Sequence, residues 1–168
     1  LPNNKVIQQQ LPQSFIFYKA KDVVSGDFPW YLEVDGIIYI AAVDCTGHGV
    51  PGALISLIGY FLLNDIVRSQ KISDPGIILD MLDAGVTATL RQDSDDSTTR
   101  DGMDIAFCKI DKKNNKLEYA GAHRPLYYLK ADGELVEIKG DKFPIGGGIY
   151  KNQTNFENHK IKFEKSKE

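Results

Sequence analysis

The sequence predicts an α+β fold: an antiparallel β-sandwich flanked by helices, in α-β-β-α layers. Two strand-like runs joined by a tight turn lie near the N-terminus, and further strand-like runs follow residue 100. Two consecutive helical patterns separate these strand groups. Strand groups interrupted by a helix pair favour antiparallel layers over alternating parallel units.

Length and composition indicate a single soluble domain. The 168 residues are 42% hydrophobic and 26% charged, which is typical of globular proteins. No apolar run approaches the roughly 18 residues of a membrane span, and a net charge of −3 argues against nucleic acid as a partner. Cys45 and Cys108 lack metal-type spacing and no secretory signal precedes them, so we expect a cytoplasmic location.

The N-terminal third begins with a short helical run and continues with strands. Residues 1–12, in which Pro12 stops the run, are interpreted as the end of an upstream linker or helix, and residues 13–168 as the domain. The aromatic run at 14–20 predicts a strand. Residues 30–34 and 37–43 predict a hairpin, because Asp35-Gly36 supplies the positive φ angles of a two-residue turn.

The middle third predicts two helices. The first spans about 51–68, with apolar residues at helical spacing: Ala53, Leu54, Leu57, Ile58, Phe61, Leu62 and Ile66. The second starts at Pro75 with Asp74 as its cap, and its apolar side carries Ile77, Ile78, Met81, Leu82, Val86 and Leu90. A polar loop is expected at 92–100.

The last third predicts two hairpins and one further strand. The expected strands are residues 104–110 with 117–122, residues 126–130 with 134–138, and residues 160–164. Trp30 and Met103 are expected in the core or on a sheet face.

The first hairpin brings two aspartates together. A two-residue turn pairs Val34 with Ile37, and the same register continued outward makes Asp27 face Asp44. Directly opposed like charges are destabilising, so either a shared proton or a bound cation is needed. The alternative is that Pro29 breaks the ladder with a bulge and the aspartates are ordinary loop caps.

Glycines near these aspartates favour the cation, because they allow the backbone to approach a ligand closely: Gly26, Gly47 and Gly49. Oxygen-only ligands point to Mg²⁺ or Mn²⁺. Two such ions can activate water and clamp a phosphoryl group, which leads to phosphate-ester hydrolysis.

A dinucleotide-binding fingerprint is the competing motif. The pattern G-x-G-x-x-G is matched by Gly47-His48-Gly49-Val50-Pro51-Gly52 between a strand and a helix. In a Rossmann unit this helix leads into a parallel strand, whereas here another helix follows. The acidic residue sought downstream would be Asp65, inside the first helix. The metal interpretation is therefore preferred.

Four ordered motifs resemble a known family. They are Val23-Val24-Ser25-Gly26-Asp27-Phe28, Asp44-Cys45-Thr46-Gly47-His48-Gly49, Tyr119-Ala120-Gly121-Ala122-His123-Arg124-Pro125-Leu126 and Phe143-Pro144-Ile145-Gly146. In order and spacing they resemble the stage II sporulation protein E branch of the PPM-type (protein phosphatase 2C-like) metal-dependent Ser/Thr phosphatases of bacteria.

The resemblance implies a centre of two Mn²⁺ or Mg²⁺ ions and a phosphoserine or phosphothreonine substrate. By position, Asp27 would bind one ion, Asp44 would bridge both, and the backbone carbonyl of Cys45 would contribute. Implied partners are a phosphorylated regulatory protein such as an anti-sigma-factor antagonist and an upstream sensor or receiver domain. The oligomeric state stays open, with a homodimer as one option.

The chain departs from the family pattern at its C-terminal end. The Ser/Thr-Asp-Gly motif and the later Asp-Asp pair, which complete the metal sites in the family, do not occur in these 168 residues. We therefore expect a truncated phosphatase domain with impaired activity and weak or absent metal binding. A phosphatase-like scaffold or dimerisation module is the alternative function.

Four further residues have both a functional and an ordinary interpretation. His48 could donate a proton to the leaving oxygen, or cap the helix start. Asp104, with Asp101, could bind a third ion, although turn chemistry is commoner. Arg124 could bind substrate phosphate as a fork, although a surface turn is the ordinary expectation.

Overall fold

A computed structural model of the chain describes residues 4–20, 23–92, 100–148 and 153–163. The helices are α1 (Asn4–Gln10), α2 (Gly49–Asn64), the π-helical turn η1 (Asp65–Ser69) and α3 (Pro75–Thr89). The strands are β1 (Phe28–Val34), β2 (Ile37–Cys45), β3 (Gly102–Asp111), β4 (Lys116–Ala122), β5 (Leu126–Leu129), β6 (Leu135–Ile138), β7 (Ile145–Gly146) and β8 (His159–Lys162).

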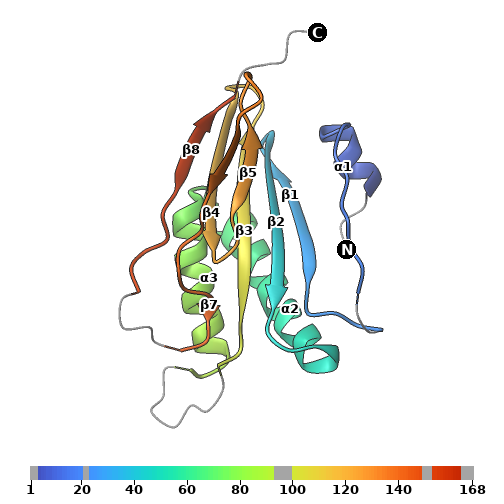
Figure 1. Cartoon of the computed structure of the whole chain (residues 1–168). Coiled ribbons are helices and arrows are strands. Elements are labelled where there is room, and N and C mark those ends of the chain that lie inside the picture. Colours follow the sequence, from blue (N-terminus) through green and yellow to red (C-terminus); the bar gives the residue numbers. More distant parts are fainter. Residues whose placement is uncertain (1–3, 21–22, 93–99, 149–152, 164–168) are drawn as a thin grey trace.

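The strands form two antiparallel sheets. The larger sheet has six strands in the order β1-β2-β3-β4-β8, with β7 paired to β3, and the smaller sheet is the β5–β6 hairpin. Helices α2 and α3 lie against the large sheet (Figure 1). The predicted α+β class is confirmed, and the predicted helix pair lies between the two strand groups. Because α2 leads into α3, no Rossmann unit forms around the glycine motif.

The core fills the space between the large sheet and these helices. Trp30 and Met103 are 2% and 1% exposed, which confirms the prediction for both residues. The Phe107 ring lies at the centre of this layer, with ring centroids 5.8 Å from Trp30 and 6.2 Å from Tyr39. Alternate residues of β2 and β3 face the helices, so the intervening residues face the opposite side of the sheet.

The β1–β2 hairpin has the predicted register. Val34 pairs with Ile37 across the Asp35-Gly36 turn, in which both residues have positive φ. The ladder continues through Pro29 paired with Ala42 and ends at Phe28 paired with Val43. The alternative of a bulge at Pro29 is therefore wrong.

The buried face predicted for the helix at about 51–68, which is α2 in the structure, is wrong in part. Residues Leu54, Leu57 and Phe61 are 57%, 52% and 66% exposed, whereas the helix buries Gly52, Ile55, Gly59 and Leu63. The sequence Gly49–Asn64 contains no charged side chain. A helix that is apolar on nearly every side has no polar stripe to mark its outer face, so its periodicity cannot identify the buried one.

The sequence predicted no apolar run of membrane-span length, but the helix that contains α2 and η1 reaches this length. The helical span Gly49–Ser69 is 21 residues long, and its most apolar window has a mean hydropathy of 1.7. One third of that window (33%) is buried inside the fold. Core helices of soluble proteins have the same length and hydropathy, so this feature alone does not assign the helix to a membrane.

The strand predicted at 14–20 is absent: these residues form an extended segment without ladder pairing. The Phe15 and Phe17 side chains are 90% and 86% exposed. Aromatic and β-branched residues favour strands, but this preference produces a strand only where a neighbouring strand pairs with the segment. The strand expected at 160–164 is confirmed as β8, and the loop expected at 92–100 lies largely outside the described residues.

Helix α3 begins with the predicted cap. One carboxylate oxygen of Asp74 accepts the N–H groups of Gly76 and Ile77 at 2.9 and 3.2 Å, and the other accepts the Asn158 amide at 2.8 Å. The side chain therefore satisfies helix donors and also tethers the segment before β8.

Replacing Asp74 with alanine is expected to lower the free energy of unfolding by about 1–2 kcal/mol, because the first turn loses its acceptor. Asp74→Asn keeps an oxygen in the capping position and is the matched control, for which a smaller loss is expected. Urea denaturation of the three proteins measures the difference. Equal losses in the two variants would contradict the assignment of Asp74 as a helix cap.

Candidate active site

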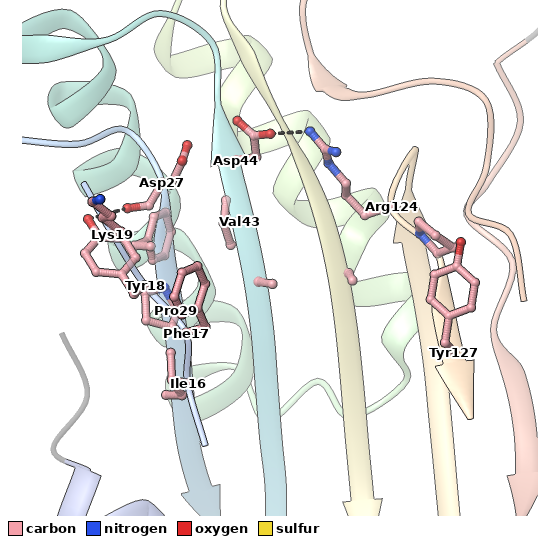
Figure 2. A pocket seen from close by; sticks show the side chains of 14 residues that line it. Ile16, Phe17, Tyr18, Lys19, Asp27, Pro29, Val43, Asp44, Arg124 and Tyr127 are labelled. Carbon is pink, nitrogen blue, oxygen red and sulfur yellow. Dashed lines mark hydrogen bonds and ion pairs between the residues drawn. The ribbon is translucent and has the colours of Figure 1, made fainter. Parts of the chain in front are cut away.

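The two aspartates singled out by the hairpin register lie at one end of the large sheet. Asp44 is the penultimate residue of β2, and Asp27 is one step beyond the Phe28–Val43 pair that ends the ladder. Their side chains lie beside the same cavity, as Figure 2 shows. The pKa of Asp27 is raised above its usual value, first by partial burial and then by the charge of Asp44 and a hydrogen bond with it. The predicted pairing of two like charges is thus present.

Glycines pack the two aspartate loops against each other. A Cβ added to Gly26 would lie 3.2 Å from the Cβ of Cys45 and 3.3 Å from the Gly52 backbone. Gly47 and Gly49 have φ angles of 78° and 65°, which glycine adopts without strain. Gly26, which the sequence suggested for close approach to a ligand, approaches the protein's own backbone and so fixes Asp27 beside the end of β2.

A third carboxylate joins them from β3. Asp44 pairs directly with Asp104 in the β2–β3 ladder, so the two residues share one face of the sheet. The Nδ1 atom of His123 lies 2.9 Å from an oxygen of Asp104. His123 was not among the predicted site residues, although it lies within the motif Tyr119–Leu126 that carries the family resemblance.

Arg124 lies on this carboxylate group rather than in a plain surface turn. Its guanidinium forms an ion pair with Asp44 (Figure 2) and lies 3.4 Å from an oxygen of Asp104. The guanidinium also acts to lower the pKa of Asp27, against the effects of burial and Asp44. One positive side chain therefore offsets charge on three aspartates.

The backbone that carries Arg124 is tightly held. The Arg124 N–H donates to the Ala122 carbonyl at 2.7 Å, and the Tyr119 hydroxyl donates to the Arg124 carbonyl. The neighbouring His123 has a φ of 58° and donates its backbone N–H to the backbone carbonyl of Asp141 at 2.9 Å. This anchoring places the arginine side chain beside the last residues of β2 and the first residues of β3.

A cavity of about 540 Å³ opens beside the aspartates. It lies between the segment before β1 and the β4–β5 connection, as Figure 2 shows. Its walls are mainly apolar, with charged groups at one end: Ile16, Phe17, Tyr18, Lys19, Asp27, Phe28, Pro29, Ala42, Val43, Asp44, Ala106, Arg124, Pro125 and Tyr127. An occupant of this cavity would contact the aspartates with its polar end.

The remaining predicted residues lie around the end of β2. Burial and the nearby charges of Asp27 and Asp44 raise the pKa of the Cys45 thiol to about 12, so its sulfur remains protonated. Asp101 accepts the Thr46 hydroxyl at 3.2 Å, which links the segment before β3 to the segment after β2. His48 is exposed at the start of α2 and makes no side-chain capping hydrogen bond.

The donor chemistry of the site suits a hard cation. Carboxylates from β2, from β3 and from the residue before β1 supply only oxygen ligands, which hard cations prefer. The Arg124 guanidinium contacts two of these carboxylates and supplies a positive charge there. Across the described ranges, no group of three or more His, Cys, Asp or Glu side chains is arranged to hold a metal ion. In this arrangement the positive charge beside Asp44 and Asp104 comes from Arg124.

Comparison with known proteins identifies relatives in both sequence and structure. Residues 35–167 match the family described as Stage II sporulation protein E (SpoIIE). The SiaA-PP2C domain of Pseudomonas aeruginosa is similar with 31% identity and a TM-score of 0.75, over 89% of this chain and 56% of that one. A search of curated proteins finds no match.

More distant structures share the fold. The PP2C phosphatase domain of SpoIIE from Bacillus subtilis, solved with a fragment of its regulatory domain, has 20% identity and a TM-score of 0.66 over 87% of this chain and 40% of that one. RsbX in complex with magnesium has 16% identity and a TM-score of 0.59 over 89% and 66% of the respective chains. The present chain therefore spans just over half of the SiaA domain chain that it resembles.

Proposed function

The chain belongs to the stage II sporulation protein E family of PP2C-like phosphatase domains of bacterial signalling, and from this premise we propose that it is the catalytic part of a metal-dependent phosphoserine or phosphothreonine phosphatase. The observation that carries the proposal is the position of Asp44 at one end of the large sheet, where it pairs with Asp104 in the β2–β3 ladder and lies beside a cavity together with Asp27. The aspartates come from three separate segments, and core packing alone does not require three carboxylates there.

The proposed roles follow the geometry and the family pattern. Asp27 would bind one Mn²⁺ or Mg²⁺ ion, Asp44 would bridge two ions, and the backbone carbonyl of Cys45 and the carboxylate of Asp104 would add further oxygen ligands. When bound, such ions activate water and the phosphate ester as Lewis acids. RsbX, which shares the fold, was solved in complex with magnesium.

Two basic groups of the chain can handle the phosphate and the leaving group. His48 is exposed at the rim of the aspartate loop, where an imidazolium could protonate the departing serine or threonine oxygen. The Arg124 guanidinium lines the cavity, where it could hold a phosphate through two N–H donors once it leaves the carboxylates. Both groups would act from solvent-accessible positions.

The substrate proposed is a phosphorylated regulatory protein, such as an anti-sigma-factor antagonist, dephosphorylated in the cytoplasm. Control would come from a sensor or receiver domain placed upstream, in agreement with the regulatory segment solved together with the Bacillus subtilis phosphatase domain. The cavity supports a protein substrate, because its apolar walls can receive side chains next to the phosphorylated residue.

Turnover of an aryl phosphate and of phosphoserine peptides by the protein that carries this domain tests the proposal. We expect Mn²⁺-dependent release of phosphate that a chelator abolishes and excess Mn²⁺ restores, with phosphotyrosine peptides as poor substrates. Activity that persists in the chelator would contradict the proposal. A folded protein without turnover on any phosphoserine or phosphothreonine substrate would instead support the phosphatase-like scaffold.

A further inference from the structure

The position of Arg124 has a consequence for metal binding. Asp44 and Asp104 are direct cross-strand partners, and the Arg124 guanidinium contacts both carboxylates. Opposed carboxylates repel each other unless a positive charge lies between or upon them. In the described arrangement that charge comes from the protein itself.

We propose that Arg124 is an internal counter-cation, which occupies the carboxylate site in the metal-free protein and competes with divalent metal ions for Asp44 and Asp104. This inference rests on the metal-binding role proposed above for these aspartates. It adds that metal loading requires the guanidinium to leave, so that metal affinity is set partly by Arg124 and not by the carboxylates alone.

Competition follows from the chemistry of the two cations. The guanidinium of Arg124 and a divalent metal ion both carry positive charge. The metal ion needs the same carboxylate oxygens that the guanidinium contacts. Both cations on the same oxygens would repel each other, so one must be displaced.

The structure gives Arg124 room to move without unfolding. The Arg124 and Asp44 side chains are 47% and 49% exposed, so the ion pair lies at the surface rather than in the core. Both side chains line the cavity of about 540 Å³, which can receive the displaced guanidinium. The backbone of Arg124 is held by Ala122 and Tyr119, so the displacement is a side-chain rotation about a fixed Cα atom.

Asp104 keeps a partner after this movement. His123 contacts the other oxygen of Asp104 at 2.9 Å and would orient the carboxylate while the guanidinium is away. The released guanidinium would lie in the cavity, next to the position proposed for the substrate phosphate. Metal loading would thus also free the phosphate-binding group.

Titration calorimetry with Mn²⁺ alone tests the proposal in Arg124→Gln, which keeps an amide but removes the charge. We expect Mn²⁺ affinity to rise by at least about tenfold, which is the lower end of the effects that groups around metal ligands exert. Arg124→Lys retains the charge and should stay close to the wild-type affinity. Arg68→Gln, at an exposed position in η1, is the matched control and should not change it.

Thermal unfolding provides a second measurement that does not depend on phosphatase activity. Without metal, Arg124→Gln should melt below the wild type because Asp44 and Asp104 lose their counter-charge, and Mn²⁺ should raise its melting temperature more than that of the wild type. Adding Asp44→Asn to Arg124→Gln should remove the gain in Mn²⁺ affinity.

Two results would overturn the inference. Equal or weaker Mn²⁺ affinity in Arg124→Gln, with binding to the wild type intact, would overturn the competition while leaving the proposed function untouched. Absence of Mn²⁺ binding in the wild type and in every variant would overturn both the competition and the metal-dependent function from which it starts.

Discussion

Replacing Asp44 with asparagine is expected to reduce Mn²⁺-dependent phosphatase turnover by at least about 100-fold, because even groups outside the ligand sphere change metal affinity or activity by ten- to 100-fold. Asp44 lies between the other two carboxylates, paired with Asp104 in the ladder and adjacent to Asp27 beyond its end. Asparagine keeps the size and one oxygen of the side chain but removes the charge that attracts the cation. Steady-state turnover at saturating Mn²⁺ measures the loss.

Asp132→Asn is the matched control for this experiment. Asp132 is exposed in the turn between β5 and β6, where its oxygen accepts the Glu134 N–H at 3.0 Å, and asparagine can accept the same hydrogen bond. Turnover of the control should equal that of the wild type, and both variants should keep the wild-type circular dichroism spectrum. If Asp44→Asn retained more than about half of the activity, Asp44 could not be a bridging metal ligand.

The largest expected loss of stability follows from replacing Phe107 with alanine. Phe107 is fully buried in β3 and packs against the rings of Trp30 and Tyr39. Removing a buried phenylalanine side chain leaves a cavity and costs about 3–5 kcal/mol. Because domains of this size are stable by only about 5–15 kcal/mol, the variant should unfold at much lower urea concentration or be partly unfolded without urea.

Leu129→Ala tests whether this loss comes from burial. Leu129 is 69% exposed at the end of β5, and its truncation should change the free energy of unfolding by less than about 0.5 kcal/mol. Urea denaturation followed by tryptophan fluorescence compares the three proteins, since Trp30 adjoins Phe107. Similar losses in the two variants would show that the sheet–helix interface is not the main core.

The candidate site was only partly predictable from the sequence. The Asp27–Asp44 pairing follows from a two-residue turn, because hairpin register is fixed locally by turn geometry. The Asp44–Asp104 pairing joins strands separated by both helices, and no local rule sets that register. Arg124 reaches the same place only through β4 and the turn after it, so the sequence indicated a surface turn where the structure has an ion pair.

The errors in the fold have the same origin. Residues 14–20 have the composition of a strand, yet no neighbouring strand pairs with them in the described structure. Helix α2 was predicted close to its observed bounds, but the face that it buries was not, because Gly49–Asn64 is apolar on nearly every side. Local residue preference predicted helix α2 correctly but predicted a strand at residues 14–20 wrongly. Tertiary packing decided which face of α2 is buried.

What the sequence by itself determined is local: the Asp35-Gly36 hairpin and its register, the Asp74 cap of α3, and the order of strands and helices. Each depends on side chains within a few residues of one another, so their chemistry is readable along the chain. What only the tertiary structure decided is the meeting of distant groups: Asp104, His123 and Arg124 around Asp44. Their approach depends on how β3 and β4 pair and on how the whole layer packs, which no short stretch of sequence specifies.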